Sequence, residues 1–219
     1  RVNNSEQGSV VFSGTTNAEN DQIVTLRIGS PPIIANPIVT VGGVWTHTQD
    51  ISSLADDTIT VTADVSDLAG NPATQDTTVI NKDTTLPTLA IDDLLMGDDR
   101  VNNSEQGAVV ISGTTIGVED GQTVTLTIAG EDTTVTVTGG VWTHTEDISS
   151  LADGNIVIKA DVSDLVGNAA IQVPRTLVKD TYLPSIAIGV IEDDDIVSNS
   201  EQAAVVISGT AETKDNQPV

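Results

Sequence analysis

Apolar and polar residues alternate over short stretches of this sequence, as they do in β-strands that bury one face. The alternation is clearest between residues 88 and 184, where it predicts seven short strands and no helix. These strands are expected at residues 88–91, 108–112, 124–128, 135–137, 141–145, 156–162 and 171–178. Seven such strands separated by turns predict an all-β, immunoglobulin-like sandwich.

The pattern recurs along the chain with a period of about 97 residues. RVNNSEQG at residues 1–8 returns at 100–107, and KDTTLP at 82–87 returns as KDTYLP at 179–184. A third copy opens with NSEQ at 199–202. We therefore expect sandwich repeats arranged head to tail: a first repeat at 1–87 without its first strand, a complete second repeat at 88–184, and the start of a third at 185–219.

Two local features support this interpretation. Trp45 and Trp142 occupy equivalent positions of the first and second repeats, and they are the best candidates to anchor each core. The segment DLAGN at 67–71 predicts a tight hairpin between the last two strands, with Gly70 and Asn71 at positive φ.

The charge balance narrows the possible partners. Asp and Glu number 32 against 8 Lys and Arg, which gives a formal net charge of -24. Phosphate recognition needs clustered Lys and Arg, so nucleic acid is excluded as a natural partner and cations are favoured. The sequence has no cysteine for a disulfide, and no apolar stretch approaches the roughly 18 residues that suggest a membrane span.

The carboxylates gather at the ends of the predicted strands, in three kinds of place. One group follows the first strand of a repeat: Asp92, Asp93, Asp98, Asp99 and Glu105, succeeded by Glu192, Asp193, Asp194, Asp195 and Glu201. A second group lies in the last hairpin: Asp161, Asp164 and Asn168, matched by Asp64, Asp67 and Asn71. The third is the single aspartate of each linker, Asp83 and Asp180.

We expect these three groups to converge where two repeats meet. In a sandwich the chain exit and the loop after the first strand lie at one end, and the last hairpin lies at the other. Carboxylate and amide oxygens at flexible spacing suit calcium, which takes about 6 to 8 oxygen ligands. The sequence therefore predicts Ca²⁺ at the junctions, although no EF-hand loop is present. The alternative is that the acidic loops are solvated surface.

The ordered set of motifs resembles the bacterial immunoglobulin-like repeats of giant adhesins exported by type I secretion, the biofilm-associated and RTX-type adhesins. The set comprises DTTLP at 83–87, VVISGTT at 109–115, GQTVTL at 121–126, GGVW at 139–142, LADG at 151–154 and VSDLVGN at 162–168. The resemblance covers the whole chain. The sequence departs from the motif set at two places. One is Asp57, where the second repeat has Gly154, and the other is a proline-bearing insertion near Pro31.

The resemblance implies a secreted stalk at the bacterial cell surface, which holds a distal binding region away from the cell for adhesion and biofilm formation. It also implies that calcium stiffens the linkers, with Asp83, Asp180 and acidic residues of adjoining loops as ligands. No enzyme is expected, because the only histidines, His47 and His144, occupy equivalent strand positions and no nucleophile is paired with a base. The rival function is a carbohydrate- or receptor-binding module. The aromatic content of only 2% argues against it, because carbohydrate sites usually stack sugars on exposed aromatic side chains.

Overall fold

The computed structural model describes residues 1–35, 38–39, 41–93, 95–191, 195–200 and 202–212. Packing divides the chain into two units, whose segments alternate along the sequence. Unit 1 comprises Arg1–Asp93, Ser112–His144 and Val157–Arg175, and unit 2 comprises Leu94–Ile111, Thr145–Ile156 and Thr176–Val219. This division passes through strands of the second repeat, so it does not test the predicted repeat boundaries.

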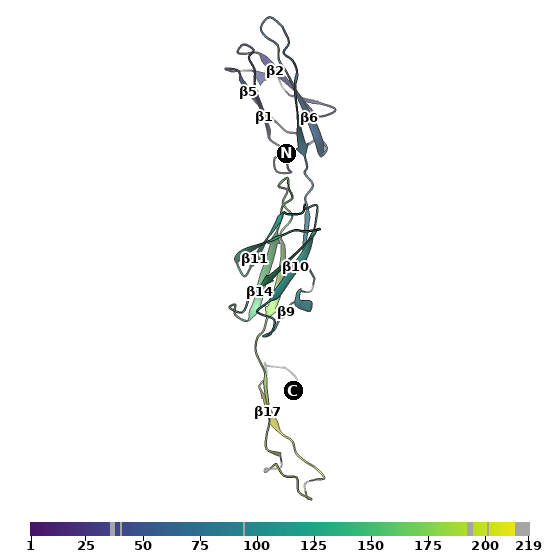
Figure 1. Ribbon diagram of the computed structural model, residues 1–219, viewed down its shortest axis with the longest axis vertical. Coiled ribbons are helices and arrows are strands. Elements are labelled where there is room, and N and C mark those ends of the chain that lie inside the picture. Colours follow the sequence, from purple (N-terminus) through teal and green to yellow (C-terminus); the bar gives the residue numbers. More distant parts are fainter. Residues whose placement is uncertain (36–37, 40, 94, 192–194, 201, 213–219) are drawn as a thin grey trace. The chain divides into compact units, whose positions relative to one another are not determined.

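Two sheets form the second repeat (Figure 1). The first contains, in order, β13 (Val141–Glu146), β10 (Val109–Ile116) and β8 (Thr88–Ile91). The second contains β12 (Glu131–Thr136), β11 (Thr123–Ile128), β14 (Gly154–Asp161), β15 (Val173–Lys179) and β9 (Arg100–Val101). The all-β, immunoglobulin-like class and the seven predicted strands are confirmed, and the short β9 was not predicted.

Burial with a period of two explains why these segments form strands. Along β10, Val109 and Ile111 are fully buried whereas Val110 between them is exposed. Along β11, Val124 and Leu126 are fully buried in the same alternating way. Such strands bury one apolar face and leave the other in water, which is the requirement for a two-sheet sandwich.

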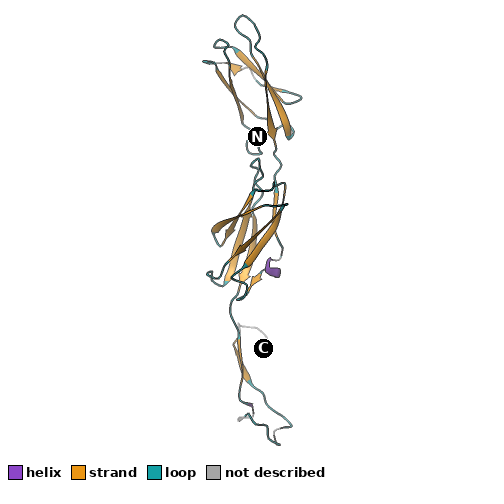
Figure 2. Ribbon diagram, viewed as in Figure 1, coloured by secondary structure: helices purple, strands orange, loops and turns teal. Residues whose placement is uncertain are grey.

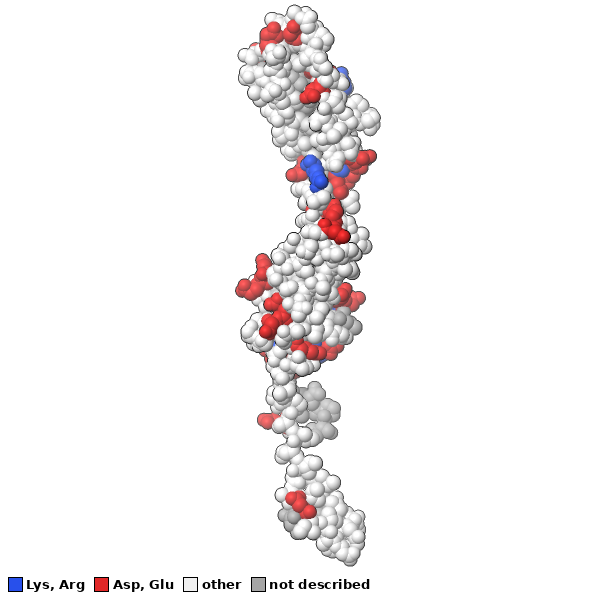
Figure 3. Space-filling model, viewed as in Figure 1, with Lys and Arg blue, Asp and Glu red and all other residues white. Residues whose placement is uncertain are grey.

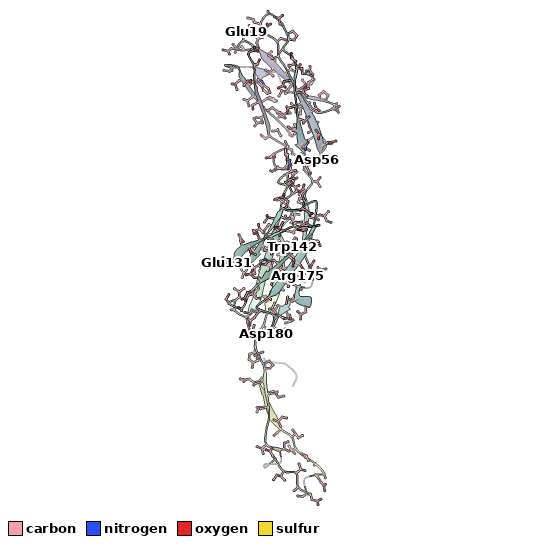
Figure 4. All side chains as sticks on the ribbon, in the orientation of Figure 1. Glu19, Asp56, Glu131, Trp142, Arg175 and Asp180 are labelled. Carbon is pink, nitrogen blue, oxygen red and sulfur yellow. The ribbon has the colours of Figure 1, made fainter. Side chains whose placement is uncertain are left out.

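Trp142 anchors the second repeat, as predicted. It lies among the strands of that repeat (Figure 4) and is only 2% exposed. Its indole ring lies so close to Gly113 that a Cβ atom on that glycine would be 2.4 Å from the ring and 2.0 Å from the backbone oxygen of Ala90. The glycine therefore allows the tryptophan and β8 to approach β10 closely.

The first repeat repeats this plan with fewer strands. One sheet pairs β1 (Val10–Thr15) with β5 (Val44–Gln49). The other contains β3 (Ile33–Ile34), β2 (Ile23–Ile28), β6 (Asp57–Asp64) and β7 (Asp76–Lys82), with β4 (Ile38–Val39) also paired to β2. Pro31 and Pro32 lie in an exposed turn before β3.

The core of the first repeat is aliphatic. Leu26, Ile28 and Ile51 are fully buried, and Trp45 packs against this cluster while remaining partly exposed. The predicted role of Trp45 as a core anchor is thus met in part. The strands beside the two tryptophans also differ, because β10 pairs with both β13 and β8, whereas β1 pairs with β5.

Both repeats hold their last strand through a short parallel pairing. β9 pairs with the end of β15, and Val2 forms the corresponding bridge to Lys82. In the second repeat, Val178 donates its backbone N–H to the Asp99 oxygen and Asp180 donates to the Val101 oxygen, both at 2.9 Å. The segment after the first strand is therefore fixed to the end of the repeat.

The remaining described residues form a pair of strands. β16 (Ser185–Ile188) pairs with β17 (Gly209–Glu212) in an antiparallel two-stranded sheet. Helical structure in the described part of the chain amounts to the single turn η1 (Leu95–Gly97), drawn in purple in Figure 2. None of the described helical structure is long and apolar enough to cross a membrane.

Candidate functional site

The last hairpin of the second repeat closes around a buried aspartate. Asp164 is 5% exposed, and its Oδ1 accepts hydrogen bonds from the backbone N–H groups of Val166, Gly167 and Asn168 at 2.7 to 2.9 Å. Its Oδ2 accepts a hydrogen bond from the Asn168 side chain at 2.8 Å. The positive φ of Gly167 lets the chain turn tightly enough for one carboxylate to bind all these groups.

In the equivalent hairpin of the first repeat, one of the two predicted positive φ angles is confirmed and the other is wrong. Gly70 has a φ of 88°, as expected, but Asn71 is not among the residues with positive φ. Asn71 instead donates its backbone and side-chain N–H groups to Asp67, at 2.7 and 2.8 Å. The role of Asn71 in this hairpin is therefore to donate hydrogen bonds to Asp67.

Asn168 connects the hairpin to residues far away in the sequence. Its Oδ1 accepts the backbone N–H of Asn4 at 2.7 Å, and its Nδ2 donates to the backbone oxygen of Asp83 at 3.0 Å. These residues all belong to unit 1. Asn168 is 2% exposed, whereas Asn71, its counterpart in the first repeat, is exposed. The same loop is thus buried only where a linker and an N-terminal turn cover it.

Weaker contacts surround this asparagine. Asn3 donates its side-chain N–H to the Val166 oxygen at 3.4 Å, and Arg1 donates to the Leu165 oxygen at 3.2 Å. The hairpin carbonyls therefore also receive donors from the turn at the start of the chain.

A pocket of about 340 Å³ lies next to the hairpin. It is lined by Asp83, Glu119 and Asp164, together with Thr85, Pro87, Gly117 and Val118, all from unit 1. Two of these three carboxylates, Asp83 and Asp164, were predicted from the sequence to meet at a junction. In the structure they share this pocket, and the assignment of a metal to it remains a prediction.

Glu119 is the residue that the sequence analysis missed. Its Oε2 accepts the backbone N–H of Leu165 at 2.8 Å, and Glu19 of the first repeat accepts that of Leu68 at 3.1 Å. The signal that could have revealed it is the recurrence of a glutamate in the loop before the third predicted strand of each repeat.

The environment of Asp164 shifts its ionisation. Burial on its own raises the pKa of this carboxyl, but hydrogen bonds from the Asn168 side chain and from the backbone N–H groups of Asn168, Val166 and Gly167 outweigh burial, and the pKa is lowered overall. Asp164 is consequently charged at neutral pH even though it is buried. A charged oxygen donor beside a pocket is what a cation requires.

The other predicted ligands make local contacts. In the last hairpins, Asp64 forms an ion pair with Arg27 at 2.5 Å, and Asp161 accepts a hydrogen bond from Gln172 at 2.7 Å. Both side chains therefore stabilise the strands that flank each hairpin.

Carboxylates of the loop after the first strand act as turn acceptors. Each of four binds a backbone N–H nearby: Asp98 that of Arg100, Asp99 that of Leu95, Glu105 that of Asn102, and Asp195 that of Ile191. The linker aspartates do the same, with Asp83 binding Thr85 and Asp180 binding Tyr182. Asp194 and Glu201 lie outside the described residues.

These contacts bear on the predicted calcium sites. Within the described ranges, no three carboxylate or histidine side chains lie close enough together to form a metal-binding group. The oxygens are of the kind that calcium binds, but each predicted ligand among the described residues serves a turn or a neighbouring side chain. On the face drawn in Figure 3, acidic residues form several separate groups and basic residues are few.

A second recurring arrangement, which we call the exit clamp, holds the chain where it leaves each repeat. Lys179 is 3% exposed, and its Nζ donates to the backbone oxygens of Ile148, Ser149 and Leu151. Beside it, Asp153 accepts the backbone N–H and the hydroxyl of Thr181, at 3.0 and 2.9 Å. The turn after β13 is thereby tied to the residues that follow β15.

The exit clamp of the first repeat includes a direct ion pair. Lys82 is 4% exposed and donates to Asp56 at 2.8 Å and to the Leu54 oxygen at 2.9 Å. The Lys82 hydrogen bond, followed by that of the Thr84 backbone, lowers the pKa of Asp56, which Figure 4 labels. Both lysines belong to the recurring motifs KDTTLP and KDTYLP, but recurrence alone did not reveal this role.

Comparisons with known proteins identify solved structures that are similar to this chain. The chain matches no protein-family model and no curated protein sequence. It is similar to a solved structure described as a Ca²⁺-stabilized adhesin that helps an Antarctic bacterium reach out and bind ice, with 31% identity, a TM-score of 0.51, and coverage of 97% of this chain and 55% of that chain. The present chain thus spans about half the length of that structure.

Two further structures extend the comparison. A bacterial immunoglobulin-like domain from the M. primoryensis ice-binding adhesin is 33% identical, with coverage of 44% of this chain and 100% of that chain and a TM-score of 0.35. The fibronectin(III)-like modules of Clostridium thermocellum CbhA, at 13% identity and a TM-score of 0.50, cover 81% of this chain and 88% of that chain and share the fold alone. From its motifs, its sandwich fold and its 31% identity to the Ca²⁺-stabilized adhesin structure, the chain belongs to the bacterial immunoglobulin-like repeats of large adhesins.

Proposed function

We propose that this chain is a calcium-stiffened extender segment of a bacterial cell-surface adhesin, which projects a distal binding region for adhesion and biofilm formation. The observation that carries the proposal is the double contact of Asn168 with the Asp83 oxygen and the Asn4 N–H. A linker whose backbone is bound by a neighbouring hairpin loses freedom to bend. An extender needs that property, because a flexible chain of repeats would not hold its end at a distance. The proposal places the protein outside the cell and assigns it no catalytic role.

Calcium is the second part of the proposal. Asp83, Glu119 and Asp164 line one pocket, and their oxygens are hard ligands of the kind that calcium prefers. A divalent cation in this pocket would draw the carboxylates together and cross-link the linker to the hairpin. Asp83 comes from the linker and Asp164 from the hairpin, so an ion that holds both would restrict their relative movement.

The test compares the intact chain in calcium and in a chelator. Free calcium at about a hundred times its dissociation constant would stabilise the folded state by about 2.7 kcal/mol for each site. We expect the melting temperature to rise with calcium and not with the same concentration of sodium chloride. Small-angle X-ray scattering on the same samples should show fewer conformations when calcium is bound.

A pair of variants localises the effect. Asp83→Asn combined with Glu119→Gln removes two pocket carboxylates, and it should abolish most of the calcium response. Glu19→Gln is the matched control, because Glu19 binds Leu68 just as Glu119 binds Leu165. A melting temperature and a scattering profile that ignore both calcium and chelator would refute stiffening by calcium.

The rival sugar-binding function has little support from the aromatic residues. Trp142 and Phe12 are buried at 2% and 8% exposure, and Trp45 is partly buried. Tyr182, at 41% exposure, remains the aromatic side chain open to a sugar ring. Clear and specific hits on a glycan array would favour the rival over the extender.

A further inference from the structure

The outer face of the β3-β2-β6-β7 sheet in the first repeat is neutral, although the whole chain carries a net charge of -24. Side chains alternate between the two faces of a strand, and the register places Ile34 beside Arg27 on the outer face. Among the side chains that the structure describes in these strands, the charged ones on this face are Arg27 and Asp64, which form an ion pair. Most of the others are threonine, and the apolar Ile23, Ile34 and Val79 are 52%, 64% and 60% exposed.

This face is the broad side of a sheet and not an end of the repeat, where the chain enters or leaves. The second repeat shows the same exposure, although described chain lies both before and after it. There the equivalent face includes Asp132 and Val157, and both are exposed. The exposure of the face therefore follows from the fold of each repeat.

The two repeats differ on this face in a way that the core does not require. Their strands align residue by residue, because Thr25 pairs with Asp64 as Thr125 pairs with Asp161. The buried residues Val, Leu and Ile of β2 recur unchanged in β11. On the outer surface, in contrast, the first repeat has Asp21, Ile23, Arg27 and Ile34 where the second has Gly121, Thr123, Thr127 and Asp132.

The four substituted residues surround a hollow in the surface of the first repeat. Asp21, Ile23 and Asp64 line this hollow, which has a volume of about 340 Å³, together with Gln22, Thr25, Val65 and Ser66. Arg27 lies on the same face of β2, and its side chain is 46% exposed. The surface thus presents a positive side chain beside a hollow that two carboxylates line.

We propose that this outer face binds the same face of a second copy of the chain. A twofold axis across β2 near Thr25 would place Arg27 of each copy over the hollow of the other copy, where Asp21 and Asp64 lie. Ile23 and Ile34 of both copies would then pack around these contacts and leave water.

Charge selects a second copy as the occupant. Two chains with a net charge of -24 repel each other over most of their surface, so they can approach only through a region that is neutral and self-complementary. The outer face has both properties, because it carries its own positive group and the carboxylates that receive it.

The symmetry determines the form of the assembly. Each copy uses its single outer face, so association closes at two copies. The two β2 strands run in opposite directions across the twofold axis. On the proposed function as an extender, such pairs would join stalks that approach from opposite directions.

Sedimentation velocity of the intact chain over a wide concentration range tests the proposal. A chelator excludes bridging by calcium, which keeps the result independent of the calcium proposal, and about 0.15 M salt screens the net charge. We expect the average mass to rise from 22.6 kDa to twice that value and to stop there. A parent chain that stays at 22.6 kDa at every concentration would overturn the proposal, and so would a mass that continues to rise beyond the dimer.

Two variants locate the contact. Arg27→Asp places an acid over the acidic hollow, and Ile34→Asp introduces the residue that the second repeat carries at this position. Each should weaken association by at least about tenfold, because like charges then face each other or a charge is buried. Ile171→Asp is the matched control, because Ile171 is 81% exposed and lies outside this face, and it should associate as the parent does. Melting temperatures establish that all variants are folded.

A mixing experiment identifies the partner of Arg27. Arg27→Asp and Asp21→Arg should each remain monomeric alone, because acid faces acid in one and base faces base in the other. An equimolar mixture of the two should form dimers, since both contacts of the mixed pair join opposite charges. Dimers that persist in Arg27→Asp alone, or a mixture of folded variants that stays monomeric, would overturn the proposed contact.

Discussion

The side-chain amide of Asn168 donates to the backbone oxygen of Asp83 across 3.0 Å, although the two residues are 85 positions apart in the sequence. The same side chain receives the Asn4 N–H and donates to Asp164, so both of its polar atoms are satisfied in a buried site. A buried polar group that loses its hydrogen-bond partner destabilises the fold by its full desolvation free energy. Asn168 is therefore the residue on which the attachment of the linker depends.

Asn168→Ala should lower the free energy of unfolding by about 1 to 3 kcal/mol, because it leaves the Asp83 oxygen and the Asn4 N–H without their partner. Urea denaturation followed by circular dichroism measures the loss. Asn71→Ala is the control, since Asn71 forms the same bonds within its hairpin but is exposed. Equal losses in the two variants would mean that the hairpin, and not the linker contact, determines the effect.

Lys179→Met should destabilise the second repeat by about 2 to 3 kcal/mol. The substitution keeps an apolar chain of similar length but leaves three backbone oxygens without the buried ammonium. Hydrogen exchange should then increase first in residues 148–151, which carry those oxygens. Lys159→Met is the comparison, because Lys159 is exposed and its loss should change stability by less than about 0.5 kcal/mol.

Gly113→Ala should be among the most damaging single-methyl substitutions in the chain. The new Cβ would lie 2.0 Å from the Ala90 backbone oxygen and 2.4 Å from Trp142, so β8 has to move. Overpacking of this kind costs about 1 to 3 kcal/mol or more. Gly107→Ala provides the control, because nothing lies within 4 Å of its Cβ position. Thermal melting that is unchanged for Gly113→Ala would contradict the close packing of β8.

Acid should weaken the fold through aspartates whose pKa lies below its ordinary value. They are Asp50, Asp56, Asp67, Asp147, Asp153 and Asp164. Because the pKa is lower in the folded state, the stabilisation is complete above the unfolded value of about 3.9 and is lost as pH falls through the folded values. Urea denaturation at successive pH values between neutrality and the acid limit measures this loss.

Asp56→Asn separates that effect from general charge. Protonation also relieves repulsion among the 32 acidic residues, which opposes the loss. The variant should be less stable than the parent at neutral pH, because Lys82 loses its ion pair, and the difference should shrink in acid. Asp93→Asn, at an exposed position, should show little difference at any pH. A constant difference for Asp56→Asn across the range would contradict the assignment.

The repeats and strands could be predicted because they are encoded locally. The alternation at Val109 and Ile111 marks β10, and the recurrence of RVNNSEQG and DVSDL marks the repeats. The parallel β9 could not be predicted, since a pairing of Arg100–Val101 with Val178–Lys179 depends on residues almost 80 positions apart.

The candidate site was predictable only in part. Recurring carboxylates identified Asp83 and Asp164, but both also have local hydrogen-bonding roles that sequence alone does not reveal. The bridging role of Asn168 depends on which groups surround it, as its exposed counterpart Asn71 shows. Lys82 and Lys179 were overlooked because lysine is ordinarily exposed. Their burial is favourable because three backbone oxygens bind Lys179, and Asp56 and the Leu54 oxygen bind Lys82.

The parallel pairing of β9 with β15 determines how a repeat responds when its two ends are pulled apart. β9 lies near the start of the repeat and β15 at its end, and the two strands point the same way. Pulling the two ends apart therefore shears the strands past each other and loads the hydrogen bonds at Asp99 and Val101 at the same time. Antiparallel terminal strands would instead peel open one bond after another. The Val2 bridge to Lys82 gives the first repeat the same resistance to stretching.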